Sequence, residues 1–287
     1  MFLGLMALIA LVQAGACATT AGAACDRDCR LAEVRNVAMA DALPAKVRAT
    51  ENGAVVKQLW TQTAANLTIH GAYAGDRGDE GVLVGSGTGA DGKPAVFGLR
   101  VKVIGGKPTE AELIVTHQGE AGLFPPTLPK PRDPLFDDLV APAQRTGATR
   151  MVAAANAYFD GIEKHNGKDV PASDTCNRIE NGVQTTRTGQ FVGGGCNALE
   201  AFAYIPEVRE RRFPVVDEER GVVLAAVAFW IPGGDYKRMI DGKEMLRHYD
   251  PRSLLLFEAF KIVDGKIARI EATMRNVPLG ASMGWSR

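Results

Sequence analysis

The chain has 287 residues, of which 46% are hydrophobic and 23% are charged, a composition typical of a globular protein of one or two domains. Its 33 Lys and Arg residues balance its 33 Asp and Glu residues. Because there is no net charge to attract phosphate groups, we expect no nucleic-acid partner and no electrostatic binding to an anionic membrane.

The first 24 residues predict an export signal. Phe2 to Val12 is apolar except for Gly4, and a tract of small residues follows over 14–24. This pattern is typical of a signal peptide with its cleavage zone, and it is too short for a stable membrane anchor. The run that ends in Cys17 also resembles a lipoprotein processing box. We therefore expect a periplasmic or secreted protein, with a lipid on Cys17 as the only link to a membrane.

Cysteine usage agrees with export. Apart from Cys17, the cysteines are Cys25, Cys29, Cys176 and Cys196. Four cysteines allow three pairings, and the sequence does not choose between them. Local pairing is the simplest arrangement, and a bridge between Cys176 and Cys196 would close a long loop in an oxidising compartment.

The first half of the chain reads as one helix followed by short strands. Apolar residues at helical spacing predict a helix over 26–42, with Asp26 as its N-cap. Gly- and Asp-rich turns then separate strands near 54–59, 66–72, 81–84, 95–104 and 109–116. The chain changes character over 119–149, where the Pro-rich run 124–134 cannot be regular structure. The apolar residues of this segment, such as Phe136, predict that it lies against the domains.

The second half repeats this order of elements. We expect a helix over 150–164, strands over 177–184, 202–216 and 222–230, and a terminal hairpin over 256–271.

One short motif shows that the halves are copies of each other. Ala49-Thr-Glu-Asn-Gly53 returns as Arg178-Ile-Glu-Asn-Gly182, and similar hairpins follow over 97–112 and 256–271. The chain is therefore interpreted as one α+β unit used twice, each copy large enough to bury its own core. We predict a signal peptide over 1–24, a degenerate first domain over 25–118, a linker over 119–149 and a second domain with the main pocket over 150–287.

The second copy resembles a known family. The run 153–165, Asp174 and the motif 178–182 are similar to the start of a SnoaL-like domain of the NTF2-like superfamily. The resemblance implies two cone-shaped units in tandem, each a curved antiparallel sheet wrapped around N-terminal helices. It also implies a small pocket at the open end of the cone, used for cofactor-free proton chemistry or for binding.

Differences between the copies indicate candidate catalytic residues on the terminal hairpin. Glu258 stands where the first copy has Leu99. With a two-residue turn, Glu258 would face Glu271 and Phe260 would face Arg269, all on one side of the sheet. Two opposed carboxylates in a poorly solvated site raise at least one pKa, which suits a general acid or base. The alternative is a Glu–Arg–Glu ladder on a solvated face.

The repeated motif supplies the second contrast. Arg178 replaces Ala49, and it shares a strand face with Glu180. Arg178 could hold an anionic oxygen while Glu180 orients it, and Asn181 forms either part of the pocket or a structural Asn-Gly turn. Candidate catalytic residues are thus Arg178, Glu258, Asp174 and Tyr158, and candidate substrate-binding residues are Glu180, Asn181, Phe260 and Glu271.

No cofactor or metal motif accompanies these residues. The four histidines are scattered, no CxxC occurs, and Gly85-Ser-Gly-Thr-Gly89 reads as a loop rather than a dinucleotide fingerprint. We expect no metal and no cofactor.

Two functions follow from these observations. The first is an exported, cofactor-independent isomerase, dehydratase or lyase for a small, largely apolar molecule, with Glu258 or Asp174 as the base and Arg178 as the oxyanion partner. The second is a non-catalytic periplasmic binding or scaffold protein. Either is compatible with a homodimer.

Overall fold

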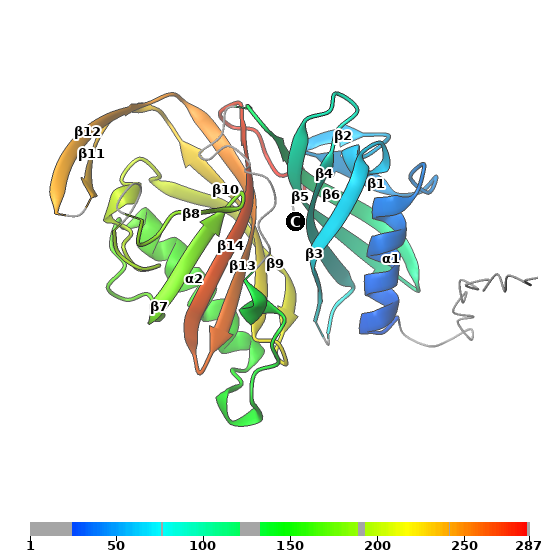
Figure 1. The fold of residues 1–287 in the computed structure, drawn as a ribbon, viewed down its shortest axis with the longest axis horizontal. Coiled ribbons are helices and arrows are strands. Elements are labelled where there is room, and N and C mark those ends of the chain that lie inside the picture. Colours follow the sequence, from blue (N-terminus) through cyan, green and yellow to red (C-terminus); the bar gives the residue numbers. More distant parts are fainter. Residues whose placement is uncertain (1–24, 76, 121–132, 189–192, 241, 286–287) are drawn as a thin grey trace, which may run out of the picture.

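The protein folds into two curved sheets, each associated with one α-helix (Figure 1). The computed structural model describes residues 25–75, 77–120, 133–188, 193–240 and 242–285. Two six-stranded sheets and one two-stranded sheet form within these residues, so the predicted α+β fold class is confirmed. None of the described helices is long and apolar enough to cross a membrane. The predicted export signal lies outside the described residues.

The first unit contains α1 (Arg27–Met39), which begins after the predicted N-cap. The Asp26 side chain accepts a hydrogen bond from the Cys29 N–H at 2.9 Å. The sheet has the order β2-β1-β6-β5-β4-β3. Its strands, with the short helix η1 (Trp60–Gln62), are β1 (Arg48–Glu51), β2 (Ala54–Val56), β3 (Ala65–Ala74), β4 (Glu80–Thr88), β5 (Pro94–Ile104) and β6 (Lys107–His117).

The second unit has the same plan, with a longer connection between β8 and β9 that contains the short helix η4 (Glu200–Phe202), and with an additional hairpin of β11 (Gly234–Ile240) and β12 (Lys243–Tyr249). It opens with α2 (Ala148–Glu163). The sheet order is β8-β7-β14-β13-β10-β9. Its strands are β7 (Ala172–Glu180), β8 (Val183–Gln184), β9 (Glu207–Asp217), β10 (Val222–Ile231), β13 (Arg252–Val263) and β14 (Lys266–Val277).

The two sheets agree in register as well as in order. β1 runs parallel to β6 with Thr50 beside Glu112, and β7 runs parallel to β14 with Ile179 beside Glu271. These four residues hold the same positions in the sequence repeat. All other neighbouring strands are antiparallel, so each sheet is mixed rather than wholly antiparallel as expected.

One predicted loop is part of a strand. The glycine-rich run that starts at Gly85 lies largely within β4. A Cβ atom at Gly85 would come within 2.4 Å of the Thr68 backbone oxygen and 2.8 Å of the Phe97 ring. Glycine is therefore required here by close packing of β3 and β5, not by a turn.

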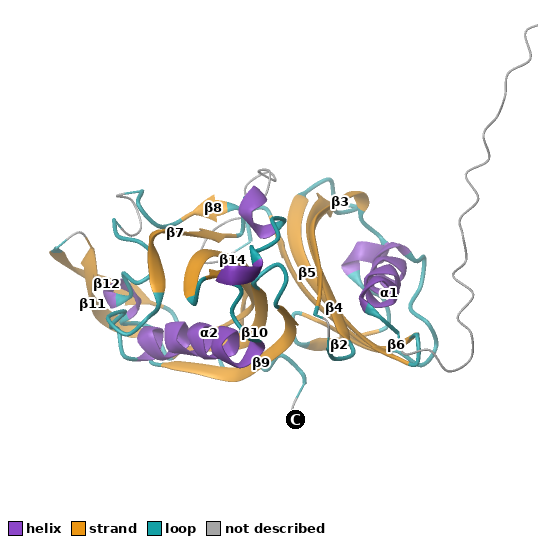
Figure 2. Cartoon of the chain, turned by 90° about the horizontal axis from the view of Figure 1, so that it is seen from below, coloured by secondary structure: helices purple, strands orange, loops and turns teal. Residues whose placement is uncertain are grey.

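Each sheet has an inner face, which packs against its own helix, and an outer face, which packs against the other unit. Figures 1 and 2 show α1 and α2 on opposite sides with the two sheets between them. Apolar residues of both outer faces, including Ile114, Leu224 and Phe257, form a shared core. We call this contact the seam.

Ion pairs cross the seam at its polar edges. Arg212 of β9 donates to both carboxylate oxygens of Glu112 of β6, at 2.6 and 3.1 Å. Arg27 of α1 pairs with the buried Asp217 at 2.5 Å. Two parallel hydrogen bonds from one guanidinium fix orientation as well as distance, so these contacts set how one sheet lies on the other.

Two connecting segments also bind the units together. The described part of the linker contains the buried Phe136, which packs into the seam as predicted. The C-terminal tail, residues 278–285, returns to the first unit, where the Trp285 Nε1–H donates to Thr50 Oγ1 at 2.9 Å and the Arg48 guanidinium lies 4.0 Å from the Trp285 ring. The division into separate domains over 25–118 and 150–287 stays a prediction.

Candidate functional site

Two glutamates lie in one cross-strand row on the inner face of the second unit. Glu258 of β13 is opposite Ala272 of β14, and Ala272 is opposite Glu180 of β7. Neighbouring strands are about 4.8 Å apart, so roughly 10 Å separates the two glutamate Cα atoms. Both side chains are buried.

Arg178 is held in a fixed position beside this row. Its guanidinium donates from Nη1 to the Tyr158 hydroxyl at 3.0 Å and from Nε to Thr185 Oγ1 at 3.2 Å. The same Nε lies 3.3 Å from Glu180 Oε1, and the guanidinium carbon lies 4.7 Å from the centre of the Phe202 ring. Arg178 is fully buried. It therefore supplies a permanent positive charge whose geometry is set by three elements.

Glu258 has an unusual protonation state. Burial raises the pKa of Glu258 to about 8, the negative charge of Glu180 acts in the same direction, and Arg178 opposes both. One of its oxygens, Oε2, is buried without a hydrogen-bond partner among the described residues. The carboxyl group therefore carries a proton at neutral pH, and it has hydrogen-bonding capacity that the protein leaves unused.

Tyr158 connects α2 to Arg178, Glu180 and Glu258, the three residues that we call the charged row. Its hydroxyl oxygen accepts the hydrogen bond from Arg178, and burial raises the pKa of Tyr158 well above its usual value. The phenol therefore stays protonated. Its ring packs edge-on against Phe260, with centroids 5.4 Å apart, and Phe260 is fully buried on the inner face. The structure thus brings together Arg178, Glu180, Glu258, Tyr158 and Phe260.

The predicted pairing of Glu258 with Glu271 is wrong. A bulge after Lys261 shifts the hairpin by one residue, so that Glu271 lies opposite Ala259 and Arg269 lies opposite Lys261. A one-residue shift moves side chains to the other face of a sheet. Glu271 therefore faces the seam, and Arg269 pairs with Asp133 of the linker at 2.5 Å.

Asn181 has a structural role that its counterpart Asn52 repeats. Its amide group donates to the Met274 carbonyl oxygen at 3.0 Å, and its oxygen accepts from the Met274 N–H at 2.8 Å. Asn52 makes the same pair of bonds to Val115. Both asparagines have positive φ in a tight Asn-Gly turn, so the predicted structural turn is confirmed. A contact of Asn181 with substrate stays a prediction.

Asp174 lies away from the buried cluster. It shares a face of β7 with Arg178, but it is exposed near the beginning of the strand. Its expected role as a base stays a prediction.

Several residues that pack around the site, directly or through one another, were not predicted from the sequence. Thr185, Phe202 and Tyr204 come from the connection between β8 and β9, and Arg238 comes from the β11–β12 hairpin. Neither segment has a counterpart of similar length in the first unit. Extra length in one of two copies was the signal that pointed to them.

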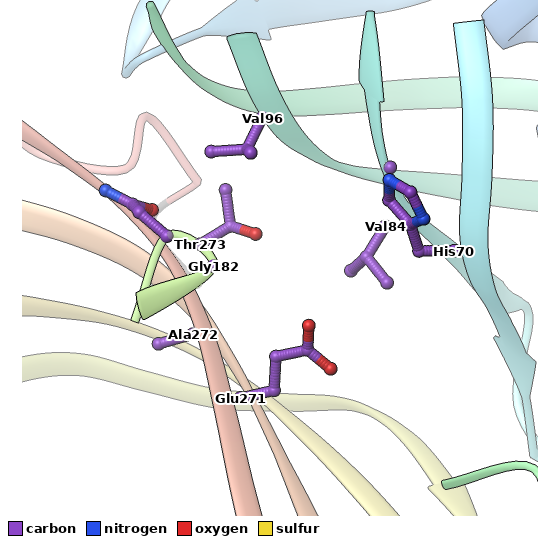
Figure 3. Close-up of a pocket in the computed structure, with 9 residues that line it drawn as sticks. His70, Val84, Val96, Gly182, Glu271, Ala272 and Thr273 are labelled. Carbon is purple, nitrogen blue, oxygen red and sulfur yellow. The ribbon is translucent and has the colours of Figure 1, made fainter. Parts of the chain in front are cut away.

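Two cavities with described linings lie at the seam. A cavity of about 290 Å³ contains charged residues of both units together with Trp285. A second cavity, of about 40 Å³, places His70 of β3 and Glu271 of β14 on opposite walls (Figure 3). His70 bonds to Ser86 Oγ at 2.8 Å. The expected main pocket within residues 150–287 stays a prediction.

The described residues contain no group of three or more metal-binding side chains. They do contain two disulfides, Cys25–Cys29 and Cys176–Cys196. The local pairing expected from the sequence is confirmed, and it is consistent with an oxidising compartment.

Comparison with known proteins assigns no function. Residues 144–274 match the model of a family described as a domain of unknown function (DUF8021). No curated protein matches the sequence. A solved structure of a protein assigned as a SnoaL-like polyketide cyclase, from Jannaschia sp. CCS1, is similar at 16% identity and a TM-score of 0.27. The likeness covers 47% of this chain and 88% of that one.

Proposed function

We propose that the second unit is a cofactor-independent isomerase, dehydratase or lyase that acts on a small, largely apolar organic molecule by acid–base catalysis. The observation that carries this proposal is Glu258, a fully buried carboxyl group with an unpartnered oxygen beside Arg178, Glu180 and Tyr158. Burying such a group costs several kcal/mol unless it is paired, and a perturbed carboxyl group of this kind is typical of functional sites.

Glu258 is the proton donor in this proposal. Its pKa of about 8 keeps it neutral at physiological pH, so it donates to a substrate oxygen rather than removing a proton. Tyr158 is the second donor. Its oxygen already accepts a hydrogen bond from Arg178, so its own O–H can donate a hydrogen bond to the substrate. A neutral carboxylic acid and a phenol together stabilise the negative charge that develops on a carbonyl oxygen.

Glu180 is the proton acceptor. Its Oε1 faces Arg178, while its Oε2 is buried without a hydrogen-bond partner among the described residues. In the first half-reaction a C–H bond next to the substrate carbonyl breaks, and its proton moves to Glu180. The electron pair of that bond forms the C=C bond of an enol, whose oxygen receives its proton from Glu258. In an isomerisation, both protons are returned in the second half. Asp174 is a second candidate for the acceptor.

The surroundings favour an uncharged, largely apolar substrate. Arg178 and Glu180 compensate each other, and Glu258 and Tyr158 are neutral. A charged ligand would therefore leave a buried net charge, which is costly. Phe260 and the other aromatic residues around it supply the apolar walls.

We also propose that the protein is exported, to the periplasm or the medium. The two disulfides support this, since they persist in oxidising compartments. Removal of residues 1–24, or a lipid on Cys17, is tested by the intact mass of the protein purified from its native host.

Hydrogen exchange tests the catalytic proposal without knowledge of the substrate. The protein is incubated in D2O with a panel of small ketones and aldehydes, and loss of the proton next to the carbonyl is followed by NMR. We expect exchange with the wild type and a loss of about 100-fold or more with Glu258→Gln. Glu271→Gln is the matched control, because Glu271 lies on the same hairpin but faces the seam.

The binding alternative predicts a different result. Members of the panel would raise the melting temperature of the wild type, and no compound would exchange in excess of the uncatalysed rate. That outcome would show that the protein binds small molecules without catalysing a reaction on them.

A further inference from the structure

The second unit contains two segments that the first unit lacks. Between β8 and β9 lie residues 185–206, where the first unit has only residues 57–64 between β2 and β3. Between β10 and β13 lies the β11–β12 hairpin, where the first unit has residues 89–93. Figure 1 shows this hairpin extending away from the body of the second unit. Both additions belong to the unit that contains Arg178, Glu180 and Glu258.

The hairpin is attached to the other segment. Arg238 of β11 donates from Nε to the Ala201 carbonyl oxygen and from Nη1 to the Tyr249 hydroxyl, both at 2.6 Å. Tyr249 of β12 stacks on Tyr204, with ring centroids 4.0 Å apart and planes 5° from parallel. Arg238 therefore holds η4, which contains Ala201 and Phe202, against the hairpin.

The same segment reaches the charged row. The Phe202 ring covers the Arg178 guanidinium, and Thr185 and Thr186 bond to Arg178 through its side chain and its backbone N–H. Contacts therefore run from Arg238 through η4 to Arg178. A cation is attracted to the face of an aromatic ring, and more strongly in a buried site, so this contact favours one orientation of the guanidinium.

We propose that Arg238 and Phe202 are positioning residues: by holding η4 in place, they keep the Arg178 guanidinium against Glu180 and Tyr158 in the arrangement that catalysis requires. This inference rests on the proposed function, and it assigns to the added hairpin a role in the chemistry of the same site. Arg238 itself bonds to Ala201 and Tyr249 rather than to the charged row.

The protonation of Glu258 reports on this arrangement in the absence of substrate. The charged and titratable groups that act on it are Arg178 and Glu180 of β7 and Tyr158 of α2. Arg178 favours the ionised form of Glu258. Displacing the guanidinium weakens that attraction, so the pKa of Glu258 should rise further above its usual value.

The test is a carbon-13 NMR titration of Glu258 in the full chain, with the signal assigned by its loss in Glu258→Gln. Arg238→Met and Phe202→Leu should each raise the midpoint by about half a pH unit or more, and Arg238→Lys should restore part of the difference. Tyr249→Phe removes a single hydroxyl group and should act in the same direction. Lys237→Met is the matched control, since Lys237 is exposed on the same strand and pairs only with Glu244 among the described residues.

Two outcomes separate this inference from the proposed function. If the variants shift the Glu258 midpoint but the wild type catalyses no exchange, the positioning role is supported and the proposed catalytic function is contradicted. The positioning role is overturned if the wild type catalyses exchange but the Glu258 midpoint is unchanged in the folded variants. Those variants are Arg238→Met, Phe202→Leu and Tyr249→Phe. With an active enzyme, we further expect these variants to lower kcat about tenfold with KM nearly unchanged.

Discussion

The inner faces of the two units have the same arrangement of strands but differ in the charged side chains that they carry. Glu51 and Glu180 occupy equivalent positions, as do Asn52 and Asn181. In the first unit, Glu51 accepts a hydrogen bond from the Trp60 N–H at 2.7 Å. In the second unit, the equivalent glutamate faces Arg178 instead. A residue that caps a short helix in one copy is thus part of a charged cluster in the other.

This difference separates structural residues from candidate catalytic ones. The asparagines make the same backbone contacts in both units, so their role is structural. Arg178 and Glu258 replace Ala49 and Leu99, which are both buried apolar residues of the first core. The first unit folds without charges at these positions, which is why we propose a catalytic role for Arg178 and Glu258 rather than a structural one.

Replacing Glu258 with leucine makes the second inner face resemble the first and should have the largest effect. We expect exchange activity to fall by about 100- to 10,000-fold, the usual contribution of a general acid. The free energy of unfolding should rise by about 1–3 kcal/mol, because an unpartnered buried carboxyl group is removed. A variant that loses stability would instead assign Glu258 to the fold.

The reverse change, Leu99→Glu, should damage the first unit. It introduces a buried carboxyl group opposite Leu113, in the cross-strand row that also contains Glu51, and position 49 has an alanine where the second unit has Arg178. We expect a loss of about 3–5 kcal/mol in urea unfolding. Full retention of stability would show that the first interior is not a packed core, contrary to the comparison.

Stability should depend on pH through Glu258. Its pKa is about 8 in the native protein and 4.5 in the reference state, so between these values the unfolded chain has released a proton that the native protein still holds. The stabilisation is full below pH 4.5 and is lost as the pH rises through 8. Measured against Glu258→Gln, the wild type should lose up to a few kcal/mol over this window. A constant difference would rule out the raised pKa.

The two disulfides should differ in their contributions. Cys176–Cys196 closes a loop of 20 residues and Cys25–Cys29 a loop of 4. Chain entropy gives about 3 and about 2 kcal/mol for loops of these lengths. Paired cysteine-to-serine variants measure the two contributions, and intact mass under non-reducing conditions shows whether the bridges form. Free thiols at Cys176 and Cys196 would also weaken the proposal of export.

Asn52→Ala and Asn181→Ala should have small and nearly equal effects. Each variant loses two hydrogen bonds to a neighbouring strand, which corresponds to a loss of about 2 kcal/mol. If Asn181 bound substrate as well, its variant would also raise KM, and no equivalent effect would follow from Asn52.

The repeat and its turns could be predicted from the sequence because they depend on local chemistry. The Asn-Gly and Asp-Gly pairs have the positive φ values that tight hairpins require. The two-residue turn after Val263 and the pairing of Ile262 with Ile267 were correctly predicted.

The site could be predicted only in part, for two physical reasons. A single bulge after Lys261 moved Glu271 and Arg269 to the other face, and no residue pattern marks such an insertion. Contacts such as that of Arg212 with Glu112, which are 100 residues apart, depend on how the sheets pack. Glu258 remained identifiable because a lone acid in an apolar strand stands out against its leucine counterpart.

The return of the C-terminal tail has a consequence for how the chain is made. Trp285 leaves the ribosome 235 residues after its partner Thr50, and Met283, which is fully buried, closes the seam only then. Until the second sheet and this tail have both been synthesised, part of the outer face of the first sheet is uncovered, and uncovered apolar sheet surface favours aggregation. Truncating even the last few residues should therefore lower the yield of folded protein by damaging the half of the chain that was synthesised first.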